Sequence, residues 1–212
     1  MSKLLFKLLN KNQAEILEIL KNFSRHGVLA GGTALMIQIA HRKSYDLDIF
    51  LPKLISKKFL HRVKQHFEKI EIITDTGNEF SFISLPQEVK VSFLYYPFPH
   101  LYKTIPTPYL SFFSWRDIAL DKAYAIGRRG EWRDYVDLYF VIKNNFSFKN
   151  IIKGAQKKFG DSFSEKLFLS QLTYFGDLKD FTVDFIGKEF SQKEIKNFLE
   201  MEVEKYKKEI LK

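Results

Sequence analysis

The sequence contains no cysteine among its 212 residues. Disulfide bonds and zinc sites built from thiolates are therefore excluded. No stretch is long and apolar enough to predict a membrane-spanning helix, and the segment 1–7 lacks the apolar core and cleavage site of a signal peptide. We therefore expect a protein of the reducing cytoplasm, with no membrane as a partner.

Acidic residues are in the minority, with 25 Asp and Glu against 34 Lys and Arg, which gives a formal net charge of +9. A basic surface attracts polyanions, so nucleic acid or nucleotide phosphate is a natural partner. Lysine-rich surfaces also serve solubility alone, and the charge by itself leaves both interpretations open. The length fits one large domain or two small lobes.

Repeats, low-complexity tracts and Gly/Ser linkers are absent too, so the organisation must be inferred from periodicity. Beyond the proline-containing stretch 97–108, the remainder reads as helical throughout and ends in a long charged helix with Ser191 as its N-cap. We therefore expect an α/β lobe over 1–110 and a helical lobe over 111–212. Before that stretch the patterns predict helices over 12–23, 34–41 and 56–67, and strands over 28–30, 45–51, 70–74, 80–85 and 89–95.

A glycine turn, Gly31-Gly32-Thr33, joins the first predicted strand to a helix. Glycines permit positive φ and a close approach of the backbone, and Thr33 could cap the helix start. The amides of such a turn can face a phosphate group. Tight strand-to-helix turns often need glycine for steric reasons alone, so the turn does not decide between a structural and a functional role.

Two aspartates, Asp46 and Asp48, lie in a predicted strand whose apolar residues are Leu47 and Ile49. Strand alternation places both carboxylates on one face, where they repel each other unless a cation lies between them. Mg²⁺ prefers oxygen ligands of this kind. The alternative is an acidic strand face that meets only solvent, although aspartate is a poor strand former.

Charged residues also interrupt two apolar helices. Lys122 falls near the middle of an apolar face, where it needs an anion such as a phosphate, pairs with an acid, or extends its ammonium group to the surface. Asp134 and Asp137 follow at i, i+3 spacing in a helix that is apolar nearly all round. Arg133 could neutralise one of them, and Lys122 or a ligand the other. A purely structural salt-bridge cluster is the competing interpretation.

Taken together, these segments resemble a known family. The chain reads Leu-Ala-Gly-Gly-Thr-Ala-Leu from Leu29 and His-Arg-Lys-Ser-Tyr-Asp-Leu-Asp-Ile-Phe up to Phe50. This resembles the first motif of the AbiEii-type nucleotidyltransferases, the toxin half of type IV toxin–antitoxin and abortive-infection systems. Residues 117–122 and 133–138 are similar to that family's downstream motifs, so the resemblance extends from about Leu29 to Ile142.

The resemblance implies an α+β fold of the polymerase-β-like nucleotidyltransferase type, with a mixed-sheet lobe followed by a helical C-terminal lobe. It implies an NTP substrate, Mg²⁺ with Mn²⁺ as an alternative, and a cognate antitoxin. Several relatives modify the acceptor end of tRNA. The residues that it implies are Gly31, Gly32, Thr33, Arg42 and Lys122 for nucleotide binding, Asp46 and Asp48 for metal binding, and Asp46, Asp48, Lys122 and either Asp134 or Asp137 for catalysis.

One departure from the family pattern concerns the third carboxylate that many nucleotidyltransferases carry on a later strand, because Ser92 stands where that acid is expected. We expect transfer of a nucleoside monophosphate to RNA, at a tRNA 3′ end, with a basic helix guiding the acceptor backbone through Lys57, Lys58, Arg62 and Lys64. Transfer to a hydroxyl of a protein or small molecule is one alternative. A degenerate member that binds nucleotide or RNA without catalysis is the other, and Ser92 favours it.

Overall fold

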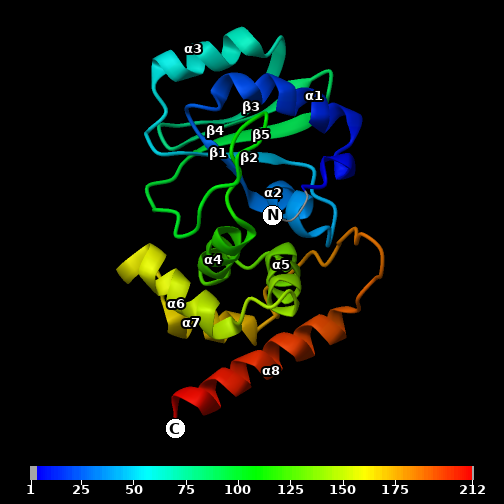
Figure 1. Ribbon diagram of the computed structural model, residues 1–212, viewed down its shortest axis with the longest axis vertical. Helices are drawn as coiled ribbons and strands as arrows, with labels where there is room; N and C mark the ends of the chain where they lie inside the picture. Colours follow the sequence, from blue (N-terminus) through cyan, green and yellow to red (C-terminus); the bar gives the residue numbers. More distant parts are fainter. Residues whose placement is uncertain (1–3, 212) are drawn as a thin grey trace. The chain divides into compact units, whose positions relative to one another are not determined.

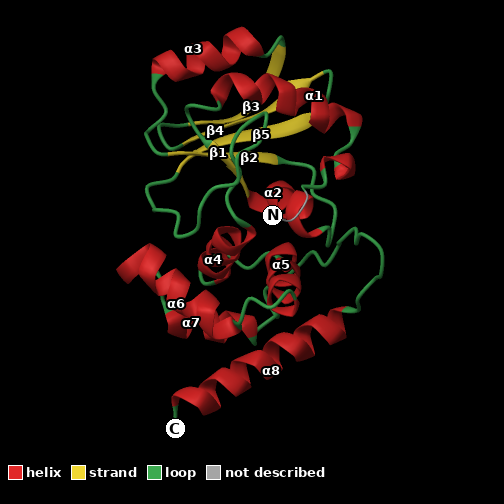
Figure 2. Ribbon diagram, viewed as in Figure 1, coloured by secondary structure: helices red, strands yellow, loops and turns green. Residues whose placement is uncertain are grey.

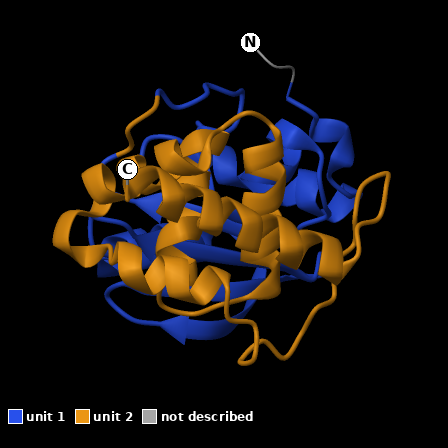
Figure 3. Ribbon diagram, turned by 90° about the horizontal axis from the view of Figure 1, so that it is seen from below, with its two compact units in different colours: residues 1–99, 103–114 blue, residues 100–102, 115–212 orange. Residues whose placement is uncertain are grey.

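The computed structural model describes residues 4–211 and divides the chain into two compact units (Figures 1 and 3). Unit 1 comprises residues 1–99 and 103–114, and unit 2 comprises residues 100–102 and 115–212. These limits differ from the expected ranges 1–110 and 111–212 at residues 100–102 and 111–114. The first three residues of the predicted first lobe, and residue 212 of the second, lie outside the described part of the chain.

Backbone hydrogen bonds explain the difference in limits. The Leu29 N–H donates to the Ser111 carbonyl and the Phe113 N–H donates to the Leu29 carbonyl, each at 2.9 Å, so this segment belongs to the sheet of unit 1. The N–H groups of Leu101 and Tyr102 instead donate to the carboxylate of Asp117 in unit 2, at 2.9 and 2.8 Å. The chain therefore passes from one unit to the other more than once.

Unit 1 is built on a five-stranded mixed sheet (Figure 2). The strand order is β1-β2-β5-β4-β3, in which β2 and β5 run parallel and the other neighbours are antiparallel. The expected α+β class with a mixed sheet is confirmed. Its elements are η1 (Phe6–Leu8), α1 (Lys11–Leu20), η2 (Lys21–Phe23), β1 (Val28–Ala30), α2 (Gly31–Ile39), β2 (Leu47–Leu51), α3 (Lys57–His66), β3 (Lys69–Asp75), β4 (Glu79–Leu85) and β5 (Val89–Tyr95).

An aromatic cluster closes one face of this sheet, on the side where Figure 1 draws α1 and α3. The Phe93 ring of β5 lies 5.0 Å from that of Phe59 and 5.3 Å from that of Phe23, and Phe67 lies 4.9 Å from Phe82. Such tilted and edge-on contacts are the favoured geometries of aromatic pairs. Because side chains alternate along a strand, the residues of β2, β4 and β5 that lie between these apolar ones are on the opposite face of the sheet.

Unit 2 is helical, with α4 contacting α5, α6 and α7, and α8 contacting α5, α6 and α7. Ser191 caps α8 as expected, since its hydroxyl accepts the Glu194 N–H at 3.1 Å. The expectation of a wholly helical remainder was wrong for residues 173–190, which form no helix. The helices are α4 (Trp115–Ile126), α5 (Trp132–Lys143), α6 (Phe148–Phe159), η3 (Gly160–Ser162), α7 (Glu165–Leu172) and α8 (Gln192–Ile210).

Aromatic side chains explain why residues 173–190 leave the helical path. Phe181 packs on Trp132 at 5.3 Å between ring centroids, and Phe190 packs on Phe140 of α5 at 5.1 Å. The ammonium group of Lys196 lies over the Phe181 ring at 4.5 Å, a cation–π contact. An irregular backbone path brings these rings onto α5. Local hydrophobic periodicity could not predict this path, because the contacts are made with residues distant in the sequence. Within residues 4–211, no helix is both long and apolar enough to span a bilayer.

Candidate active site

The glycine turn of unit 1 forms the first residues of a helix. Helix α2 begins at Gly31, which has a φ of +68°, a conformation that favours glycine. Its N-cap residue, Ala30, offers no side chain to the free N–H groups of the first turn. The predicted cap by Thr33 was wrong, because Thr33 lies inside the helix and its hydroxyl donates to the Asp46 carbonyl. The first turn of α2 therefore lacks a side-chain cap.

The two aspartates lie next to this turn. Asp48 is in β2, opposite Ala30 of β1, and Asp46 directly precedes the strand. Both are half-buried, whereas Leu47 and Ile49 between and beyond them are fully buried on the opposite face. The predicted alternation is therefore present. A Cβ atom on Gly31 would collide with the Asp48 carboxylate, so the glycine makes room for that group.

Three consecutive backbone carbonyls ahead of β2 are held by buried side chains. The Gln13 amide of α1 donates to the carbonyls of Ser44 and Tyr45, at 2.9 and 3.1 Å, and Thr33 of α2 donates to that of Asp46. Gln13 itself is only 2% exposed. Because these bonds fix the backbone, they fix the direction of the carboxylates that follow. Sequence reasoning missed Gln13, which the pattern presents only as a helix residue.

A cation lies against the same turn. Arg42 is 3% exposed, and one of its guanidinium nitrogens, Nη2, lies 3.0 Å from the place that a Cβ on Gly32 would occupy. Its other terminal nitrogen, Nη1, donates to the Lys43 carbonyl at 2.9 Å. The same Cβ would lie 2.7 Å from Ser44 Oγ, so Gly32 leaves room for the side chains of both Ser44 and Arg42. The positive charge of Arg42 and the uncapped amides of α2 favour an anion at the turn.

The register of the sheet places Ser92 in line with Asp48. Ser92 of β5 is the direct partner of Asp48 on β2 and of Ser81 on β4, so the three side chains share one face. The Ser81 hydroxyl donates to the carboxylate of Glu79 at 2.6 Å. Glu79 is a second residue that sequence reasoning missed. Its alternation with Phe80 is the same signal that identified the aspartates.

We predict that Gly31→Ala removes activity while costing only modest stability. An alanine at this φ is strained by about 1 kcal/mol, and its methyl group must displace the Asp48 carboxylate. Gly77→Ala is the matched control, since a Cβ there meets nothing within 4 Å. Nucleotidyl transfer and thermal unfolding of both variants check this. Full activity in Gly31→Ala would show that the position of Asp48 does not matter.

In unit 2, Lys122 pairs with both predicted aspartates. Its ammonium nitrogen lies 2.6 Å from Asp134 Oδ1 and 2.8 Å from Asp137 Oδ2, so it joins α4 to α5. The Lys122 side chain is 14% exposed, and those of Asp134 and Asp137 are 6% and 0% exposed. Asp134 Oδ2 is buried without a hydrogen-bond partner among the described residues. The suggested pairing of Arg133 with these acids was wrong, because Arg133 pairs with Glu131.

A second cluster of the same composition ties α4 to α6. Lys158, with a fully buried side chain, lies 3.1 Å from Asp117 Oδ1 and 2.7 Å from Asp121 Oδ1. Asp117 also accepts the N–H groups of Leu101 and Tyr102. Lys158 could not be singled out from the sequence, because it lies in a lysine-rich helix. Helix α4 therefore carries two buried lysine–carboxylate clusters.

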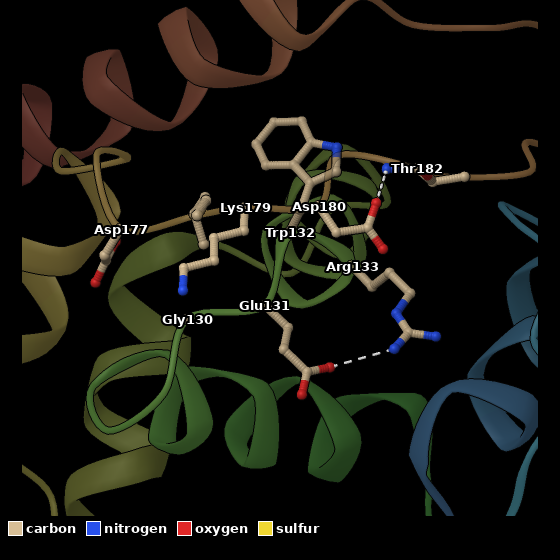
Figure 4. A pocket seen from close by; sticks show the side chains of 9 residues that line it. Gly130, Glu131, Trp132, Arg133, Asp177, Lys179, Asp180 and Thr182 are labelled. Atoms are coloured by element: carbon tan, nitrogen blue, oxygen red, sulfur yellow. Dashed lines mark hydrogen bonds and ion pairs between the residues drawn. The ribbon is translucent and has the colours of Figure 1, made fainter.

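A pocket of about 310 Å³ in unit 2 is lined by residues of two segments, 130–133 and 177–182 (Figure 4). Its charges are mixed: Figure 4 shows Glu131 directed toward Arg133, while the Asp180 carboxylate accepts the Thr182 N–H at 2.8 Å. None of the predicted site residues lines it. Because its acids and bases offset each other, the pocket offers no particular attraction for nucleotide phosphates.

The mixed sheet, the glycine turn and the paired aspartates of unit 1 define a nucleotidyltransferase. The chain belongs to the AbiEii family of nucleotidyl transferase toxins of type IV toxin–antitoxin systems, whose family model matches residues 16–210. This confirms the resemblance noted in the sequence. Members of this class use NTPs and divalent metals, and the toxin family implies a cognate antitoxin.

Similar proteins were found by sequence and by fold. An uncharacterized protein of Aquifex aeolicus is 31% identical over 206 residues, which covers 91% of this chain and 98% of the relative. MenT4, a nucleotidyltransferase toxin of Mycobacterium tuberculosis, shares the fold with a TM-score of 0.63 at 13% identity, over 91% of this chain and 81% of MenT4. Protein JHP933 of Helicobacter pylori gives a TM-score of 0.56 at 20% identity, over 97% and 94% of the two chains.

Proposed function

We propose that this toxin transfers a nucleoside monophosphate from an NTP to a hydroxyl of RNA, at a tRNA 3′ end, with Mg²⁺ held by Asp46 and Asp48. The observation that carries the proposal is the placement of these carboxylates beside the uncapped turn of α2. The formal net charge of +9 supports an RNA acceptor. The cytoplasm, where NTPs and tRNA occur together, is the proposed place of action.

The donor set fits a divalent cation that shares its ligands with a substrate. Asp46 and Asp48 offer hard oxygen atoms on one face, and each is half-buried rather than closed off. Mg²⁺ is commonly bound by one or two carboxylates together with substrate phosphates. When bound, it would neutralise the triphosphate and lower the pKa of the attacking hydroxyl. Mn²⁺ has similar ligand preferences and is an alternative.

The residues of the turn have a separate task. We assign the triphosphate to the amides of Gly31, Gly32 and Thr33, with Arg42 as the cation that stabilises charge on the departing pyrophosphate. In the reaction, the hydroxyl oxygen bonds to the α-phosphorus as the bond from that phosphorus to the pyrophosphate oxygen breaks. The burial of Arg42 supports this role, because an anion is held more strongly by a charge that water screens poorly.

For unit 2 we propose that Lys122 contacts phosphate and that Asp134 or Asp137 accepts the proton of the attacking hydroxyl. Family membership supports a role for these motifs. Asp134 Oδ2, which has no hydrogen-bond partner among residues 4–211, favours Asp134 over Asp137 as the base. Within unit 2, the two carboxylates more than balance the charge of Lys122. A structural role in joining α4 to α5 is therefore part of the proposal.

Incubation with each of the four α-labelled NTPs, Mg²⁺ and total tRNA tests the proposed reaction. We expect label in tRNA with at least one NTP, and loss of that label after removal of the 3′-terminal nucleotides by a 3′ exonuclease. The same assay with a cell lysate detects other acceptors. Label in protein or in small molecules, but not in RNA, would refute the RNA acceptor, and no label at all would favour the nucleotide-binding alternative that Ser92 suggested.

A further inference from the structure

A basic pocket lies in unit 1 away from the residues assigned to the reaction. It has a volume of about 520 Å³, within the range of small-ligand sites. It lies at the end of β2, at Leu51, roughly 10 Å along the strand from Asp48 by the usual rise per residue. Three segments form its wall, namely residues 25–26 after η2, residues 51–56 from the last residue of β2 onward, and the first two turns of α3.

The charges of this pocket are all of one sign. Its lining contains Arg25, Lys53, Lys58 and Arg62 but neither aspartate nor glutamate. Within residues 4–211, none of these four cations forms an ion pair with a carboxylate. The pocket also receives the N-terminus of α3, whose dipole adds positive potential. A concentration of unbalanced positive charge in a hollow favours an anionic ligand.

His26, in the pocket wall, lies beside one of these cations. Arg62 Nη1 lies 3.4 Å from His26 Nε2, and the other ring nitrogen, Nδ1, is buried without a hydrogen-bond partner among the described residues. Burial and the neighbouring Arg62 charge lower the pKa of His26 below its ordinary value of 6.5. The ring is therefore neutral at pH 7, and the cations around it have no carboxylate to compensate them.

The rest of the lining is apolar. Leu51, Pro52, Leu54 and Phe59 lie beside the cations, and Leu54 is 59% exposed. Phe59 is fixed in place by its contact with Phe93. A nucleotide combines the two properties that this wall matches, a phosphate for the cations and a flat base for the apolar side chains. An acidic peptide offers the charge but not the flat apolar group.

We infer that this pocket holds one nucleotide of a single-stranded RNA segment, with its phosphate against Lys58 and Arg62 and its base against Leu54. The inference rests on the proposed RNA acceptor and adds a second contact with it, remote from the reacting hydroxyl. Such a contact raises the affinity for the acceptor and selects RNA that reaches the pocket, without taking part in the chemical step.

Binding of a 5′-fluorescein-labelled single-stranded RNA of twelve nucleotides, followed by fluorescence anisotropy at several KCl concentrations, tests the inference. We expect K58A/R62A to lose affinity about tenfold and the slope of log K against log salt to fall by about 0.7, the value for the one phosphate contact that is lost. Leu54→Ala should weaken binding several-fold without changing the slope, because its contact is not ionic.

The control is K57A/K64A, which removes the same charge from the same helix at exposed positions outside the pocket. At about 0.15 M KCl, K57A/K64A should bind RNA within about twofold of the wild type, because exposed charges outside the pocket are screened at that ionic strength. Equal losses in the two double variants would overturn the pocket and indicate diffuse attraction. Since Arg62 contacts His26, Arg25→Ala provides a further variant that leaves this contact intact.

The outcomes separate this inference from the proposed reaction. If the wild type binds RNA in the manner described but transfers no label to it, the pocket stands and the proposed reaction fails. If the wild type labels RNA and K58A/R62A shows an unchanged Kd and KM for RNA, the pocket is refuted and the reaction stands. Competition by a polyglutamate peptide as effective as that of unlabelled RNA would refute the nucleotide as occupant.

Discussion

Replacement of Asp48 by asparagine is expected to reduce nucleotidyl transfer on the order of a thousandfold, the scale of losing one preorganised electrostatic contact to the transition state. The substitution keeps the shape of the side chain and removes its charge. Asp48 lies in β2 next to Gly31, and the strand is otherwise held by β1 and β5, so the sheet should remain intact. Circular dichroism and thermal unfolding should show a folded protein.

The loss should have a metal signature. With a non-hydrolysable NTP analogue present, Mg²⁺ should raise the Tm of the wild type, and this rise should be absent or much smaller in Asp48→Asn. Asp75→Asn is the matched control, because it makes the same chemical change at an exposed position at the end of β3. Transfer by Asp48→Asn at the rate of the control would refute the assignment of Asp48 as a metal ligand. Expression of the wild type in cells should arrest growth, and expression of Asp48→Asn should not.

The residues of this site that belong to a regular alternation of polar and apolar side chains were predictable from the sequence. Asp46 and Asp48 alternate with buried residues, and two-residue alternation is a local property of strands. The glycines were predictable as a turn, but the reasons that the structure gives for them are not local. Gly31 faces the carboxylate of Asp48, seventeen residues later in the sequence, and Gly32 faces the side chains of Ser44 and Arg42.

Side chains that act across the fold could not be predicted. Gln13 reads as an ordinary helix residue, yet its amide holds the carbonyls ahead of β2, about thirty residues further along. Identifying Glu79 required knowledge of the strand register. Only the pairing of β4 with β5 places Ser81 beside Ser92, and Ser81 donates its hydroxyl hydrogen to Glu79. For Lys122 the sequence left open a phosphate, an acid, or extension of the ammonium group to the surface. Its pairing with Asp134 and Asp137 depends on how α4 packs on α5.

Lys158→Met is expected to lower the free energy of unfolding of unit 2 by about 3–5 kcal/mol, the usual effect of removing one partner of a buried ion pair. The methionine fills most of the volume of the lysine, so the loss comes mainly from the carboxylates of Asp117 and Asp121 that remain without their cation. Asp117 keeps two backbone N–H donors, whereas Asp121 lies 2.7 Å from Lys158 and loses this ion pair. Lys158→Met combined with Asp121→Asn should therefore recover part of the stability.

Lys122→Met is the informative comparison, since it removes the cation from the other lysine–carboxylate cluster on α4. If Lys122 contacts phosphate as proposed, its loss should raise the KM for NTP or lower kcat in the protein that remains folded, whereas folded Lys158→Met should transfer label at the wild-type rate. Urea unfolding and transfer assays, corrected for the folded fraction, separate the two effects. Wild-type kinetics in folded Lys122→Met would leave Lys122 with only the task of joining α4 to α5. A loss below about 1 kcal/mol in Lys158→Met would mean that Asp117 and Asp121 find other partners when Lys158 is removed.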